Sequence, residues 1–180
     1  MAQLKVGGVM PQFNYDTPFG RNLSIAETAA QKEKTAILFL RYYGCPVCQY
    51  DMHMIAESYD EIVGENGRIM IVLQSSAENL NNQIEKDTFP FDIICDPNQD
   101  LYKQFEIAPA ESMMKMVDVK SIAKISKAKA KGIKHGEYEG EELQLPAAFI
   151  VNKNLEILYS RYGKSVADVP SNEELKELLK

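Results

Sequence analysis

Three short apolar runs, separated by stretches with helical spacing, constrain the fold of this chain more than any other feature of its sequence. They occupy residues 35–42, 68–73 and 91–95, and each is rich in β-branched or aromatic side chains. Apolar runs of this length without alternation indicate strands that are buried on both faces. The repeated strand–helix order therefore predicts an α/β fold with a central, mainly parallel sheet that helices cover on both sides.

Both ends of the chain predict antiparallel additions that make the sheet mixed. Turn residues Pro18 and Gly20 predict an N-terminal hairpin with strands at residues 13–16 and 21–23. A C-terminal hairpin is predicted from strands at 147–152 and 155–162, and a final helix at 172–179. Because neither an internal repeat nor a low-complexity linker interrupts the pattern, we expect residues 1–180 to form a single domain.

The middle of the chain departs from this pattern at about residues 108–142. Seven lysines lie between Lys115 and Lys134, beside an apolar stripe at helical spacing, and glycines and glutamates follow them. We expect a lysine-rich helical insertion before the C-terminal hairpin. Its lysine face is interpreted first as a solvated face, and the alternative is a docking surface for an acidic partner or an anionic lipid.

Composition excludes several classes of protein. The net charge of −6 argues against nucleic-acid binding, which requires a basic face to neutralise phosphates. No apolar run approaches the ~20 residues of a membrane span, and the N-terminal residues lack a secretory signal pattern, so we expect a cytoplasmic protein. Three cysteines are too few for a disulfide-framed scaffold, and in a reducing compartment they indicate redox or metal chemistry instead.

Cys45 and Cys48 form a C-x-x-C motif directly after the first apolar run. Gly44 permits a turn there, and Pro46 suits the first position of a helix. A thiolate at a helix N-terminus faces free N–H groups, which lower the thiol pKa from ~8.5 to roughly 3.5–7.5. We therefore expect Cys45 to be an exposed attacking thiol and Cys48 to be the thiol that resolves its product.

Two other interpretations of the motif stay open. The pair could be half of a zinc site, although only Cys95, His53 and His135 remain as further ligands and none has finger-like spacing. The two thiols could also be inert. Cys95 alone is interpreted as a small apolar side chain at a strand end, and His53 as a solvated or capping histidine.

The segments RYYGCPVC after TAILFL, VGGVMPQFNYDTPFGRNLSI and LQLPAAFIVNKNLEILYSRYGKS together carry a resemblance. They resemble the C-x-x-C type of peroxiredoxin-like proteins in the alkyl hydroperoxide reductase/thiol-specific antioxidant (AhpC/TSA) family, which has a thioredoxin fold. The resemblance implies that Cys45 is the nucleophile and Cys48 its redox partner. It also implies that Leu145 and Pro146 form the cis-proline loop that, with Gly44 and Pro46, makes up the active-site loops.

The chain departs from the usual peroxiredoxin pattern at two places. Peroxiredoxins carry a threonine three residues before the reactive cysteine, where this chain has Tyr42, and no arginine comes just before the strand at 147–152. Arg41 and Arg161 are the candidates for a positive charge that tunes the thiolate. These departures favour dithiol–disulfide exchange over the usual peroxide route.

The functional expectation is an antioxidant thiol-disulfide oxidoreductase that cycles a Cys45/Cys48 dithiol–disulfide couple, without metal or organic cofactor. Its substrate would be a disulfide or a peroxide, and a thioredoxin-type reductant would reset it. The alternatives are a thioredoxin-dependent peroxidase acting on hydrogen or alkyl peroxides, and a non-catalytic redox sensor or binding module. The resemblance also allows a homodimer, and it implies neither nucleic acid nor membrane as partner.

Overall fold

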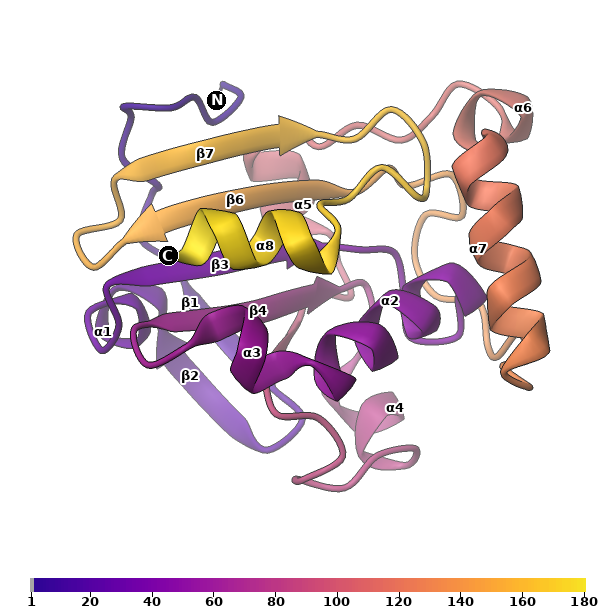
Figure 1. The fold of residues 1–180 in the computed structure, drawn as a ribbon, viewed down its shortest axis with the longest axis horizontal. Coiled ribbons are helices and arrows are strands. Elements are labelled where there is room, and N and C mark those ends of the chain that lie inside the picture. The colour runs from indigo at the N-terminus through magenta and orange to yellow at the C-terminus, as the bar shows by residue number, and fades with distance from the viewer. Residues whose placement is uncertain (1) are drawn as a thin grey trace.

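The computed structural model describes residues 2–180, in which a single seven-stranded sheet organises the chain (Figure 1). The strands are β1 (Asn14–Thr17), β2 (Gly20–Ser24), β3 (Lys34–Phe39), β4 (Gly67–Leu73), β5 (Asp92–Cys95), β6 (Ala147–Asn152) and β7 (Ile157–Tyr162). Their order across the sheet is β2-β1-β5-β4-β3-β6-β7.

The sheet is parallel at its centre and antiparallel at both sides. β3, β4 and β5 run parallel, with Leu73 opposite Cys95 at one end. The N-terminal hairpin joins β5 through Asp16, and the C-terminal hairpin joins β3 through β6. The predicted α/β class with a mixed sheet and two flanking hairpins is therefore confirmed.

Helices cover both faces of the sheet, and two of them are shorter than the sequence suggests. They are α1 (Ile25–Ala29), α2 (Pro46–Glu57), α3 (Tyr59–Val63), α4 (Ala77–Asn81), α5 (Asp100–Gln104), α6 (Met113–Met116), α7 (Val119–Ala130) and α8 (Asn172–Leu179). The helix predicted after the C-x-x-C breaks at Ser58, where the Tyr59 hydroxyl accepts a hydrogen bond from the Ile69 backbone. The next predicted helix ends at Asn81 because consecutive asparagines compete for backbone hydrogen bonds.

Each face of the sheet carries its own hydrophobic core. One core lies under α1 and α5 and is built around aromatic rings. Phe39 is at its centre, with ring centroids 5.1 Å from Tyr102 and 5.9 Å from Phe149. The opposite core lies under α2, α3 and α8 and includes Cys45 and Cys48. The dithiol is therefore part of a packed layer rather than of the molecular surface.

The lysine-rich insertion forms α6 and α7, and α7 lies beside α2 at one end of the sheet (Figure 1). Lys124 of α7 pairs with the buried Asp51 of α2 at 2.7 Å, and Lys131 pairs with Glu57 at 3.1 Å. Lys120 and Lys127 are exposed. Part of the predicted solvated face therefore docks the insertion onto the helix that follows the dithiol.

No helix in residues 2–180 has the length and hydropathy of a membrane span.

Lys124→Met tests this docking contact, because it leaves the Asp51 carboxylate buried without its partner. We expect the free energy of unfolding to fall by about 2 kcal/mol, less than for a fully buried pair because Lys124 is partly exposed. Burial already raises the pKa of Asp51, although Lys124 opposes this effect. Without Lys124, the folded variant keeps a proton on Asp51 at pH values above ~4, where the unfolded chain has released it. The loss in the free energy of unfolding therefore grows as the pH rises from that value.

Chemical denaturation at a series of pH values measures both effects. Lys129→Met is the matched control, because it removes the same charge from an exposed position on the same helix. An Lys124→Met variant as stable as this control at neutral pH would show that the pair does not hold α7 in place.

Candidate active site

The two cysteines of the C-x-x-C meet at the start of α2. Cys45 is the N-cap residue, its sulfur accepts a hydrogen bond from the Cys48 backbone N–H at 3.3 Å, and Pro46 occupies the first helical position. The Cys48 thiol donates to the Cys45 sulfur at an Sγ–Sγ distance of 2.8 Å, and both cysteines are free. Local sequence explains this arrangement, because Pro46 fixes the first turn and places both sulfurs on one side of the helix.

The expectation that Cys45 is exposed is wrong. Cys45 has an exposed fraction of 0% and Cys48 of 2%. The main chain of residues 136–137 lies directly on Gly44, where the Gly136 N–H donates to the Gly44 carbonyl at 2.8 Å. A side chain at position 44 would collide with the Glu137 backbone, so the glycine is needed for this close approach as well as for the turn.

Arg41 provides the charge that the buried sulfur requires. Its Nη2 lies 3.2 Å from the Cys45 sulfur, and its backbone N–H donates to the Cys48 sulfur at 3.4 Å. The guanidinium is itself only 6% exposed. It extends from the chain just after β3, and this places the positive charge in the same buried layer as the dithiol.

The environments of the two thiols move their pKa values apart. Burial by itself raises the pKa of Cys45, but the Cys48 thiol and the Arg41 guanidinium outweigh it and lower this pKa to about 6. Burial, together with the hydrogen bond to Cys45, raises the pKa of Cys48 well above its usual value. At neutral pH the site therefore holds one thiolate and one protonated thiol in contact.

The structure separates the other predicted site residues from the sulfurs or changes their geometry. Arg161 lies on β7, where it pairs with Glu174 at 3.0 Å and Asp168 at 3.8 Å, so its charge is used at α8 rather than at the thiolate. The expectation of a cis bond at Leu145-Pro146 is wrong, because no peptide bond in residues 2–180 is cis. Pro146 is buried just before β6.

Tyr42, Glu142 and His135 belong to the site but were not found from the sequence. The Tyr42 hydroxyl donates to Glu142 Oε2 at 2.7 Å and lies 3.1 Å from His135 Nε2. Burial and the Glu142 hydrogen bond raise the pKa of Tyr42, so this hydroxyl keeps its proton. Glu142 also accepts from Arg41, at 3.1 Å through Oε1. The acidic stretch after the lysines was visible in the sequence, but no spacing rule connects it to residues about a hundred positions earlier.

Cys95 and His53 stay outside the dithiol cluster. Cys95 is partly buried at the end of β5, and burial raises its pKa to about 12, as expected for an inert thiol. The His53 ring packs against Phe89 at a centroid distance of 5.4 Å. Within residues 2–180, no group of three or more His, Cys, Asp or Glu side chains could hold a metal ion, so the zinc interpretation lacks a ligand set.

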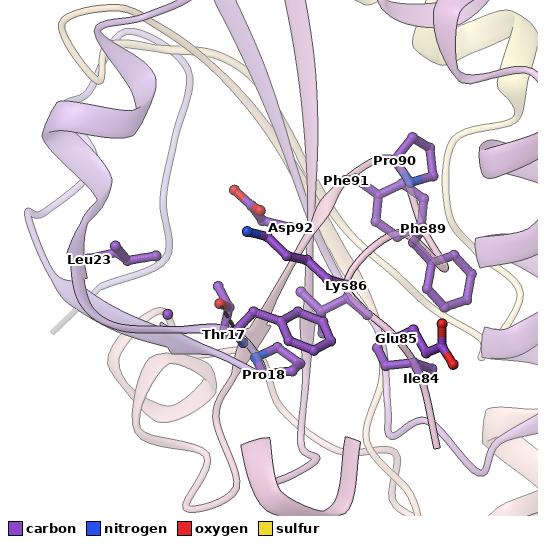
Figure 2. A pocket seen from close by; sticks show the side chains of 13 residues that line it. Thr17, Pro18, Leu23, Ile84, Glu85, Lys86, Phe89, Pro90, Phe91 and Asp92 are labelled. Carbon is purple, nitrogen blue, oxygen red and sulfur yellow. Dashed lines mark hydrogen bonds between the residues drawn. The ribbon is translucent and has the colours of Figure 1, made fainter. Parts of the chain in front are cut away.

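A separate pocket of about 420 Å³ opens between the β1–β2 hairpin and the chain that leads into β5 (Figure 2). It is lined by apolar groups such as Pro18, Leu23 and Phe89, with Lys86 and Asp92 at its side. Neither reactive cysteine nor Arg41 contributes to this pocket. The chemistry of the dithiol is therefore not located there.

The structure has a mixed sheet with a dithiol at the turn between β3 and α2, and an arginine lowers the pKa of one of its sulfurs. These features define a thiol oxidoreductase of the thioredoxin-fold class. The family model for the AhpC/TSA family matches residues 6–160, and the chain belongs to that family. Family members in general reduce peroxides and take electrons from thioredoxin-type reductants. The protein is thus an enzyme of thiol-based oxidoreductase or peroxidase type. No curated protein matches its sequence.

Solved structures agree on the fold. The chain is similar to the reduced 2-Cys peroxiredoxin of Plasmodium vivax, with 12% identity, a TM-score of 0.67, and coverage of 97% of this chain and 79% of that one. It is similar to peroxidoxin BcpB of Mycobacterium tuberculosis, with 10% identity, a TM-score of 0.68, and coverage of 98% and 97%. A peroxiredoxin-like protein from Aquifex aeolicus has 15% identity, a TM-score of 0.63, and coverage of 98% and 88%. The predicted thioredoxin-like fold is thereby confirmed.

Arg41→Met tests the electrostatics of the site. Titration of the wild-type Cys45 thiolate should show a midpoint at about pH 6. Loss of the guanidinium should move this midpoint upward by ~1 to 3 pH units, because a neighbouring opposite charge has an effect of that size. The shift must be upward, since removal of a positive charge disfavours the Cys45 thiolate.

The pH dependence of alkylation by iodoacetamide, followed by peptide mass spectrometry at Cys45, measures this midpoint. Arg161→Met is the control, because it removes an arginine that pairs elsewhere. An unchanged midpoint in Arg41→Met, or an equal change in the control, would contradict the assignment of Arg41.

Proposed function

We propose that the protein reduces small hydroperoxides, with Cys45 as the peroxidatic cysteine and Cys48 as the resolving cysteine. The observation that carries this proposal is the contact between a Cys45 thiolate, the Arg41 guanidinium and the Cys48 thiol within one buried cluster. The separation of the two pKa values supports this assignment of roles, because the nucleophile must be an anion and its partner must keep a proton.

The proposed cycle has two steps and a reset. The Cys45 thiolate attacks the distal peroxide oxygen, an S–O bond forms, and the O–O bond breaks. The leaving alkoxide or hydroxide takes a proton and departs as alcohol or water, which leaves a sulfenic acid. Cys48 then attacks that sulfur and water leaves, so that a Cys45–Cys48 disulfide remains. A thioredoxin-type dithiol reduces this disulfide and becomes oxidised itself.

Arg41 has a second part in this proposal, because it lies where negative charge develops. As the O–O bond breaks, charge moves from the sulfur to the leaving oxygen. The Arg41 Nε atom is buried without a hydrogen-bond partner among the described residues, and Nη2 already contacts the sulfur. The guanidinium can therefore donate to a peroxide oxygen. It would replace the function of the threonine that this chain lacks at position 42.

Thiol–disulfide exchange is the second candidate, because the same C-x-x-C pair supplies the attacking and resolving thiols that exchange requires. The burial of both sulfurs favours the smaller oxidant, since a small hydroperoxide needs a smaller displacement of the surrounding atoms than a protein disulfide does. We also propose that residues 1–180 act as one domain, and that a reducing compartment such as the cytoplasm supplies the electron donor. Homodimerisation is not required for this chemistry.

Peroxide consumption with a thioredoxin system as donor tests the proposal. The wild type should turn over hydrogen peroxide, and Cys45→Ser should abolish turnover. Cys48→Ser should consume about one equivalent per subunit and accumulate a sulfenic acid that dimedone traps, because nothing resolves it. Cys95→Ser, the matched control, should keep the wild-type rate.

The same preparations should be tested with glutathione disulfide and with insulin. Rapid reduction of these disulfides without consumption of peroxide would overturn the proposal in favour of the second candidate. Absence of turnover with every oxidant would contradict both and leave a redox-sensing or binding role.

A further inference from the structure

A segment without regular structure lies against the turn that carries the dithiol. Residues 133–142, here called the strap, connect the end of α7 to the chain before β6 and contain neither helix nor strand. The strap crosses Gly44, the residue before Cys45, at main-chain contact distance. Because Cys45 has no exposed surface, an oxidant or reductant larger than a small hydroperoxide cannot reach its sulfur unless a neighbouring element moves.

Among the elements around the dithiol, the strap is the one whose displacement costs the least free energy. No residue of 133–142 is buried, whereas α2 and β3 on the other sides of the dithiol contribute to the hydrophobic cores. Polar bonds attach it to the rest of the protein, among them Ser75 to Glu139 at 2.6 Å and the Glu141 N–H to Gln74 at 2.8 Å. Water can replace such bonds when the segment opens, and local openings occur where buried apolar contacts are few.

Glu142 connects the strap to the reactive centre. One carboxylate oxygen accepts from Arg41 at 3.1 Å and the other accepts from Tyr42 at 2.7 Å, while the Glu142 main-chain carbonyl accepts from Arg41 at 2.5 Å. The same guanidinium touches the Cys45 sulfur through its other nitrogen. The strongest attachment of the strap is therefore made to the counter-ion of the thiolate.

We propose that the strap is a gate over the dithiol, latched shut by Glu142, and that its closed state excludes oxidants and thiols larger than a small hydroperoxide from Cys45. Brief opening admits the thioredoxin-type dithiol that reduces the Cys45–Cys48 disulfide. This inference rests on the proposed function for the identity of the molecules that pass. Glu142 acts through Arg41 and Tyr42, so it is a positioning and selectivity residue rather than a catalytic one.

The test uses two thiol reagents of different size on the reduced full-length protein. Iodoacetamide is the small probe, and a maleimide attached to polyethylene glycol is the bulky one. The rate at Cys45 is measured by peptide mass spectrometry and normalised to an exposed-thiol peptide. A change in the pKa of Cys45 alters both rates equally, so the ratio of bulky to small rates reports access alone.

In the wild type, Cys45 should react much more slowly with the bulky reagent than with iodoacetamide. Glu142→Ala should raise the ratio by roughly tenfold or more, because it removes two side-chain hydrogen bonds and one hydrogen bond to a charged group alone contributes ~1.5 kcal/mol. Glu142→Gln should restore part of the selectivity, because its amide oxygen still accepts from Arg41. Glu137→Ala is the matched control: it removes a charge from the same strap at an exposed side chain and should leave the ratio unchanged.

Gly136→Ala opens the gate by a different route. A Cβ at this position would lie 2.9 Å from the Gly44 Cα, so the strap must move away while Glu142 stays intact. This variant should also raise the ratio. A wild-type ratio in both Glu142→Ala and Gly136→Ala, or free access of the bulky reagent to wild-type Cys45, would overturn the proposal.

Hydrogen exchange on the wild type tests, without any variant, whether the strap opens. The amides of Gly136 and Glu141, which bond to Gly44 and Gln74, should exchange much faster than the β3 amides. Equal protection of strap and sheet would overturn the gate. Because neither measurement requires peroxide turnover, a gate that opens in a protein without peroxidase activity would refute the proposed function alone.

Discussion

The contact between the Arg41 guanidinium and the Cys45 sulfur is the interaction on which the rest of the site depends. A buried thiol resists ionisation, because its anion loses the stabilisation of water. Here a buried cation and a neighbouring thiol compensate for that loss, so that burial and a lowered pKa occur together at Cys45. Arg41 follows the end of β3, the sulfur of Cys45 caps the start of α2, and their connection through Gly44 brings the two charges together.

The lysine-rich insertion is part of the site rather than an appendage to it. Its helix docks on α2 through Lys124 and Asp51, and its trailing residues then cross Gly44 and reach Arg41 through Glu142. Positive residues thus hold α7 in place, and negative residues attach the strap. Glu142 also gives the Arg41 guanidinium a second partner. The same ion network therefore joins the strap to the arginine that contacts the Cys45 sulfur.

The burial of the two sulfurs is compatible with the different roles proposed for them. Within the enclosed pair, the pKa of Cys45 is lowered and that of Cys48 is raised, which are the protonation states that the proposed attacking and resolving roles need. A thiolate that is open to solvent would react with any disulfide or electrophile in its surroundings, whereas an enclosed one selects by size. On the proposed function, selectivity and reactivity would come from one cluster, which includes Tyr42 at the position of the usual threonine.

The strands, the α/β class and the pairing of Cys45 with Cys48 could be predicted from the sequence, because apolar runs, turn residues and helix-capping residues act within a few positions of one another. Helix breaks at Ser58 and Asn81 were not predictable, since the first depends on a contact with Ile69 and the second on local competition that propensity describes poorly. Tertiary packing encloses Cys45, places Arg41 rather than Arg161 beside it, and brings Glu142 to Tyr42. Those contacts join segments up to a hundred residues apart, and their energies depend on burial, which no local pattern encodes.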